Sequence, residues 1–106
     1  MKEYLKLYWK HTSEKEAEEP VVIIYEVDLQ EERYATRLID IFADYHTENT
    51  EDKAWGFVTE APILTVAEIN SGEYGEEFYA CLLTSAEFEE IWHTKTYHGD
   101  LYFQKN

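Results

Sequence analysis

The chain has 106 residues, of which 44% are apolar and 16% aromatic, and a formal net charge of −14. This length fits one domain over residues 1–106, and the hydrophobic content is too high for a disordered tail. The 23 Asp and Glu against 9 Lys and Arg exclude the common nucleic-acid binders, which need a basic surface, and disfavour an anionic membrane as partner.

The sequence also indicates a compartment. Cys81 is the only cysteine and has no partner for an internal disulfide. No run of about 18 apolar residues occurs, so we expect no membrane-spanning segment. The N-terminal MKEYLKLYWK alternates polar and apolar residues and lacks the apolar core of a signal peptide. We therefore expect a reducing cytoplasm.

The pattern of apolar and β-branched residues predicts several strands. In chain order we expect them over residues 3–11, 21–27, 34–44, 54–59, 78–83 and, as a short last strand, 101–103. The alternation in 34–44 is imperfect, which a bulge near Leu38–Ile39 would explain. Polar loops are expected at 12–19 and 45–53. One face of the first strand is half aromatic and half basic, and we expect it at an exposed edge open to pairing with a second copy: Tyr4, Lys6, Tyr8 and Lys10.

Two helices are predicted from their capping signals. Thr65 and Glu68 have capping-box spacing for a short helix over 66–71, and Gly72 follows where a terminating glycine is common. Thr84 and Glu87 repeat the spacing before a helix over 85–94.

These elements sum to an α+β domain. We expect an antiparallel sheet of four to six strands with the C-terminal helix packed on one face. Four large aromatic residues are assigned to the core: Trp9, Phe42, Phe88 and Trp92.

Little in the sequence indicates catalysis or a metal. The four histidines lack the short fixed spacing of zinc ligands, so we expect no metal and no cofactor: His11, His46, His93 and His98. Cys81 lies in an apolar run and fits an inert core cysteine better than a nucleophile. Glu26 and Asp28 are one possible pair of catalytic carboxylates, but no catalytic motif accompanies them. We expect the chain not to be an enzyme.

Charge distribution carries the main functional signal. Between Ala54 and Thr94 there are eight acidic residues and no Lys or Arg. Acidic residues that only aid solubility are usually interleaved with basic ones. Aromatic residues beside these acids suit the capture of a basic protein, because charges steer encounter and a buried ring supplies a hot spot. The candidate binding residues form two groups, with Trp55 and Tyr74 as anchors: Glu48, Glu51, Asp52 and Trp55, then Glu73, Tyr74, Glu76 and Glu77.

Two other interpretations stay open. The chain could be a small hydrolase that uses carboxylates such as Glu26 and Asp28, which a pocket holding a carboxylate of raised pKa would favour. It could also be a housekeeping interaction module whose acidity only keeps it in solution, which an apolar patch away from the acidic loops would favour.

Several segments together resemble a family of small bacterial domains of unknown function. The resemblance covers most of residues 3–92 and is carried by strand and helix motifs: Tyr4–His11, Glu19–Val21, Ile24–Asp28, Arg33–Arg37, Ile41–Asp44, Glu68–Asn70 and Ser85–Trp92. Two features depart from it. Asp44 is followed by Tyr45 and a longer acidic loop where the family tends to have a tight Asp-Gly turn, and the chain continues from Thr94 to Asn106.

Small acidic domains of this kind are similar to the immunity proteins encoded beside bacterial toxins, including those of contact-dependent growth inhibition. The resemblance implies an inhibitor without catalysis, which binds a cognate toxin domain, often a basic nuclease, and blocks its active site. It would bind neither nucleic acid nor membrane itself.

Overall fold

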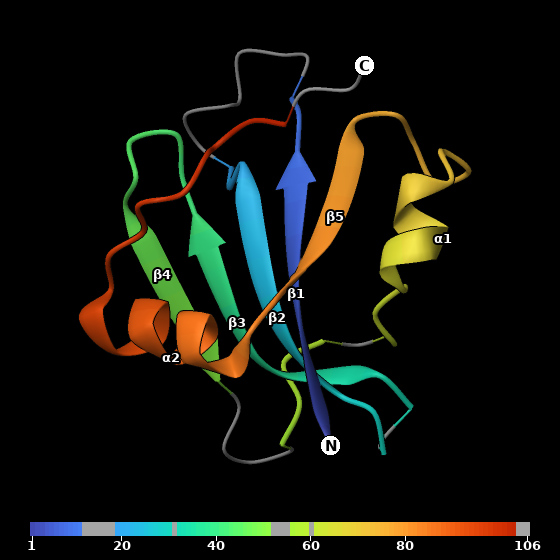
Figure 1. Cartoon of the computed structure of the whole chain (residues 1–106), viewed down its shortest axis with the longest axis horizontal. Helices are drawn as coiled ribbons and strands as arrows, with labels where there is room; N and C mark the ends of the chain where they lie inside the picture. Colours follow the sequence, from blue (N-terminus) through green and yellow to red (C-terminus); the bar gives the residue numbers. More distant parts are fainter. Residues whose placement is uncertain (12–18, 31, 52–55, 60, 104–106) are drawn as a thin grey trace.

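The computed structural model describes residues 1–11, 19–30, 32–51, 56–59 and 61–103. In this part of the chain the elements are β1 (Lys2–Trp9), β2 (Val22–Asp28), β3 (Tyr34–Ile41), β4 (Thr47–Glu51), α1 (Val66–Asn70), β5 (Phe78–Leu83) and α2 (Ser85–Thr94). The strands form one antiparallel sheet in the order β4-β3-β2-β1-β5. Figure 1 shows α2 and the chain after it lying over one face, with α1 beside β5. The predicted α+β class is confirmed.

The helices agree closely with their sequence signals. In each capping box the threonine hydroxyl accepts from the backbone N–H three residues on, at 3.1 Å, for Thr65 with Glu68 and for Thr84 with Glu87. The predicted range 85–94 is confirmed for α2. Gly72 has φ +86° immediately after the C-cap of α1, a conformation that glycine adopts without steric cost.

Two strand predictions are wrong, and one strand was missed. Thr47–Glu51, predicted as loop, is strand β4 and pairs with β3. An edge strand needs only one partner and tolerates polar residues on both faces, so its sequence has no apolar alternation. Residues 56–59 form no strand; Gly56 has φ +85°, and Val58 N–H donates one bond to the Ala35 carbonyl. Residues 52–55 lie outside the described residues, and 101–103 form no strand.

Strand β1 is central, so the prediction of an exposed edge is wrong. It pairs with β2 on one side and β5 on the other. Tyr8 is only 8% exposed, and the ring of Tyr4 lies 5.0 Å from that of Phe88. The reason is tertiary: β5 returns beside β1, and α2 with the chain after it covers the aromatic face.

The bulge in β3 lies earlier than predicted. Arg37 pairs with Glu26 and Ala35 pairs with Val27, so Thr36 is the extra residue. A bulge turns neighbouring side chains to one side of a strand. Here it brings both Thr36 and Arg37 to Glu26.

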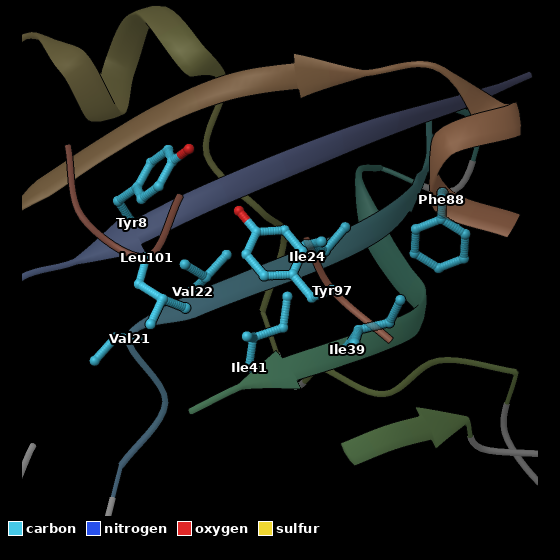
Figure 2. Packing of buried hydrophobic residues seen from close by; sticks show 9 residues of the cluster. All are labelled: Tyr8, Val21, Val22, Ile24, Ile39, Ile41, Phe88, Tyr97 and Leu101. Carbon is cyan, nitrogen blue, oxygen red and sulfur yellow. The ribbon is translucent and has the colours of Figure 1, made fainter. Parts of the chain in front are cut away.

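The main core lies between α2 and the sheet. Figure 2 shows nine buried residues of this cluster, which come from β1, β2 with Val21 just before it, β3, α2 and the C-terminal segment. Phe88 is fully buried, as predicted, and Trp92 packs partly buried against the cluster. Trp9 and Phe42 are only half-buried. Outside the main cluster, the Trp9 ring lies tilted 4.1 Å from that of His11, and the Phe42 ring stacks on that of His46 at 4.8 Å.

Candidate functional site

The two faces of the sheet are covered to different extents. On the α2 side, Val22, Ile24, Ile39 and Ile41 are 0% exposed. The residues between them point to the opposite face, as strand alternation requires, and are only half-buried. We call this second surface the open face. It includes half-buried Leu7, Trp9, Ile23, Tyr25, Leu38, Asp40 and Phe78 and exposed Glu48. Toward β5, Leu5 and Ala80 of the same face are buried with Ile69 of α1 in a second core cluster.

The open face changes from apolar to acidic across the strands. Pairing registers place one residue from each strand in a continuous row, which runs from β5 to β4: Ala80, Leu7, Ile23, Asp40 and Glu48. The acidic end of this row therefore lies at the β4 edge of the sheet.

An apolar pocket lies at the other end of the open face. It has a volume of about 210 Å³, and its lining combines sheet residues with the chain around α1: Leu7, Tyr25, Pro62, Ile63, Leu64, Ile69, Tyr74 and Phe78. Arg33 holds one wall in place by donating to the carbonyls of Ile63, at 2.8 Å, and Leu64, at 3.2 Å. The pocket is therefore formed by anchored backbone.

The segment that carries Tyr74 is tied to the sheet at both ends. Asn70 makes two hydrogen bonds with Ala80 of β5, accepting at 2.7 Å and donating at 2.9 Å. The Glu77 carbonyl accepts from Lys10 N–H at 2.8 Å. Between them, Gly75 has φ +130°, and a Cβ there would lie 1.5 Å from a Glu77 carboxylate oxygen. A side chain at this position would therefore displace the Glu77 carboxylate and leave the backbone in a strained conformation.

Asp40 and Glu48 form the acidic end of the open face. Burial raises the pKa of the Asp40 carboxyl to about 6, and the negative charge of Glu48 adds to the shift. Burial likewise raises the pKa of Tyr25 to about 12, with the charge of Asp40 adding to it. Glu48 contacts His46, with Oε1 of Glu48 3.2 Å from Nε2 of His46.

A buried carboxylate of the sheet, Glu26, lies on the α2 side and is fully paired. It is 6% exposed and accepts hydrogen bonds from Tyr4, Thr36 and Arg37. Burial alone would raise its pKa, but the bonds from Arg37 and Thr36 outweigh burial and hold the pKa at about 2. Arg37 also binds Glu89 of α2 at 2.8 Å. This network fastens α2 to the sheet.

The guanidinium of Arg37 is also held by aromatic rings. It lies 4.7 Å from the ring centre of Phe88 and 4.8 Å from that of Trp92. Asp28, the second carboxylate of the pair proposed from sequence, contacts Lys2 at 3.4 Å and accepts from Gln30 N–H. Both carboxylates of that pair therefore have structural partners.

The predicted binding residues lie at opposite edges of the sheet. Glu48 and Glu51 are on β4 but project from opposite faces, since they pair with Asp40 and Arg37. Asp52 and Trp55 lie outside the described residues. The second predicted group lies between α1 and β5, where three residues are exposed and Glu77 is half-buried: Glu73, Tyr74, Glu76 and Glu77. The open face links Glu48 to the pocket beside Tyr74.

Sequence reasoning missed Asp40 and Tyr25 as members of this surface. The available signal was a carboxylate between Ile39 and Ile41 in a predicted strand. Such a strand position is half-buried or central, where charged residues are seldom found. Ile23 lies between Asp40 and Leu7 of the pocket in the row across the sheet. This pairing is set by strand register and could not be predicted from the hydrophobic pattern.

Two of the four histidines border this surface: His46 contacts Glu48, and the ring of His11 lies 4.1 Å from that of Trp9. His93 and His98 are exposed. Cys81 is half-buried against the α2-side cluster. Within the described ranges, no group of three or more His, Cys, Asp or Glu is placed to hold a metal ion. Nor is any helix there long and apolar enough to cross a membrane.

Fold and surface define an α+β domain whose antiparallel sheet has one covered and one partly open face. The chain belongs to the family described as Domain of unknown function (DUF6881), whose model matches residues 3–97. Searches of curated proteins and of solved structures find no match. The resemblance to a domain of unknown function is therefore confirmed, and the match extends to Tyr97, beyond helix α2.

Proposed function

We propose that this protein is an immunity protein that binds and neutralises a basic protein toxin, such as a nuclease domain. One observation carries the proposal: a half-buried sheet face that joins an apolar pocket to a pair of carboxylates, in a chain of net charge −14. A surface of this composition suits a protein partner, because apolar contact supplies affinity and charge supplies rate and selectivity.

The proposed mechanism is occlusion. A nuclease needs Lys and Arg to grip phosphate, and an acidic surface can occupy the same groove. The field of a strongly acidic chain attracts such a partner over roughly a Debye length, about 8 Å at physiological salt. The toxin can then no longer bind its substrate, and no covalent bond is broken.

One observation favours the hydrolase alternative, although on different residues from those proposed from sequence. Glu26 is held ionised by Arg37, so it is a poor proton donor. Among the described carboxyl groups whose pKa departs from its ordinary value, Asp40 is the one whose pKa is raised. A carboxylate enzyme would therefore use Asp40 and Glu48, and Asp40→Asn would abolish turnover of its substrate.

Affinity capture from source cells tests the proposal. The tagged protein is incubated with lysate, eluted in rising salt, and the eluate is identified by mass spectrometry. We expect one basic partner that survives moderate salt and whose nuclease or other toxic activity falls to zero at one equivalent of the protein. An unrelated acidic protein of similar net charge is the control. A partner whose activity is unchanged, or the same proteins eluting from the control, would refute the proposal.

A further inference from the structure

Resting on the proposed function, we infer that the open face is the docking surface, and that it takes a basic segment of the partner in two places. An apolar side chain of the segment enters the pocket beside Tyr74, and a Lys or Arg of the same segment binds between Asp40 and Glu48. The partner is thus recognised by an apolar residue and a basic residue at a fixed spacing.

The size of the pocket favours a side chain over a free small molecule. Its volume is about 210 Å³, below the roughly 300–1,000 Å³ of sites that hold drug-sized ligands. A cavity of about 150 Å³ already holds a benzene ring. One Phe, Leu or Met side chain therefore fits. Tyr74, which is 51% exposed, lines the pocket and offers its ring to such a side chain.

Comparison of buried Glu26 with half-buried Asp40 shows that, in the described part of the chain, the acidic end lacks a cation. Glu26 is paired with Arg37 and has a pKa of about 2, whereas Asp40 has a pKa of about 6. Asp40 has no hydrogen-bond donor or cation among the described residues, and its charged neighbour is another carboxylate, Glu48. A partner cation would do for Asp40 what Arg37 does for Glu26.

Sheet geometry sets the spacing between the two places. Leu7 of β1 lines the pocket, and Asp40 lies in the same row two strands away. Adjacent strands are about 4.8 Å apart, so Leu7 and the midpoint between Asp40 and Glu48 are roughly 12 Å apart. An extended segment advances about 3.3 Å per residue, and its side chains alternate between two sides. The apolar and basic residues of the partner are therefore expected about four positions apart, where both side chains face the sheet.

Short synthetic peptides test this surface directly. The probe is the peptide Lys-Phe-Ser-Ser-Ser-Arg-Lys with blocked ends, in which Phe and Arg are four positions apart, and the control has Ser in place of Phe. Titration into ¹⁵N-labelled protein at low salt, followed by amide chemical shifts, gives both affinity and location. We expect shifts at Leu7, Ile23, Tyr25 and Asp40 and few on α2, with the control peptide binding roughly tenfold more weakly.

Matched variants distinguish binding at the two proposed places from attraction by the net charge of the protein. Asp40→Asn should weaken probe binding roughly fivefold or more, whereas Glu90→Gln removes the same charge from exposed α2 and should change little. Tyr74→Ala should reduce the preference for Phe over Ser, whereas Tyr45→Ala, a similarly exposed tyrosine, should not. The spectrum of each variant reports whether it is folded.

The outcomes distinguish the docking surface from the proposed function. Equal losses for Asp40→Asn and Glu90→Gln, or shifts centred on α2, would overturn the docking surface even if a toxin is captured and inhibited. Probe binding at the open face that depends on Phe and Asp40 supports the surface, and it does so independently of what a captured partner proves to do.

Discussion

Asp40 is expected to destabilise the folded protein at neutral pH, and Asp40→Asn should remove this cost. The pKa of Asp40 is raised from 3.8 to about 6. At about 1.36 kcal/mol for each pKa unit, the difference corresponds to about 3 kcal/mol. Because Asp40 lies on the open face and retains contact with water, we expect a smaller effect of about 1–2 kcal/mol.

The sign follows from the direction of the shift. A carboxyl whose pKa is higher in the folded state favours folding when protonated, so its stabilising effect is present below pH 3.8 and is lost as the pH rises through about 6. Asp40→Asn cannot titrate. Its free energy of unfolding should match that of the unchanged protein near pH 4 and exceed it by about 1–2 kcal/mol near pH 7.5.

Urea unfolding followed by tryptophan fluorescence measures this difference at intervals between pH 4 and 7.5, at moderate salt to screen the net charge. In both proteins the stabilising contribution of Glu26 is lost as the pH falls from about 4.5 toward its folded pKa of about 2. Comparing the two proteins at each pH therefore cancels this contribution. Glu48→Gln should reduce the pH-dependent difference, since the charge of Glu48 contributes to the shift. A difference that is the same at pH 4 and 7.5 would refute the reasoning.

Three further outcomes are expected. Arg37→Ala leaves Glu26 buried without its cation and should cost about 3–5 kcal/mol in urea unfolding; a loss below 1 kcal/mol would mean that the network does not fasten α2. Phe88→Ala removes a fully buried ring and should cost about 3–5 kcal/mol, with a fall in melting temperature as the check. Reversing the charges of Glu76 and Glu77 to Lys should slow association with a captured basic partner, measured by stopped flow, and leave folding nearly intact. Unfolding of this variant with unchanged binding would contradict the assignment.

Local signals predicted much of the secondary structure. The capping boxes at Thr65 and Thr84 fixed both helix starts, because a cap is satisfied within one turn of chain. The apolar run of β2 and the range of β5 were visible for a similar reason, since hydrophobic pattern is a local property. The same patterns indicated Phe88 as a core residue.

The polar strand β4 and the site depended on contacts between distant segments. β4 was hidden because pairing with β3, rather than its own residues, makes it a strand. The burial of Tyr8 depends on α2 and the C-terminal segment, which no local pattern places over β1.

By itself the sequence determined the strong negative charge, the α+β class and the ends of the helices, since these follow from composition and short-range chemistry. Only the tertiary structure decided which carboxylate has a cation. Register places Arg37 opposite Glu26 on the covered face and Glu48 opposite Asp40 on the open face. Because strand register is set by packing across the whole sheet, the acidic end of the candidate surface could not be seen in the order of residues.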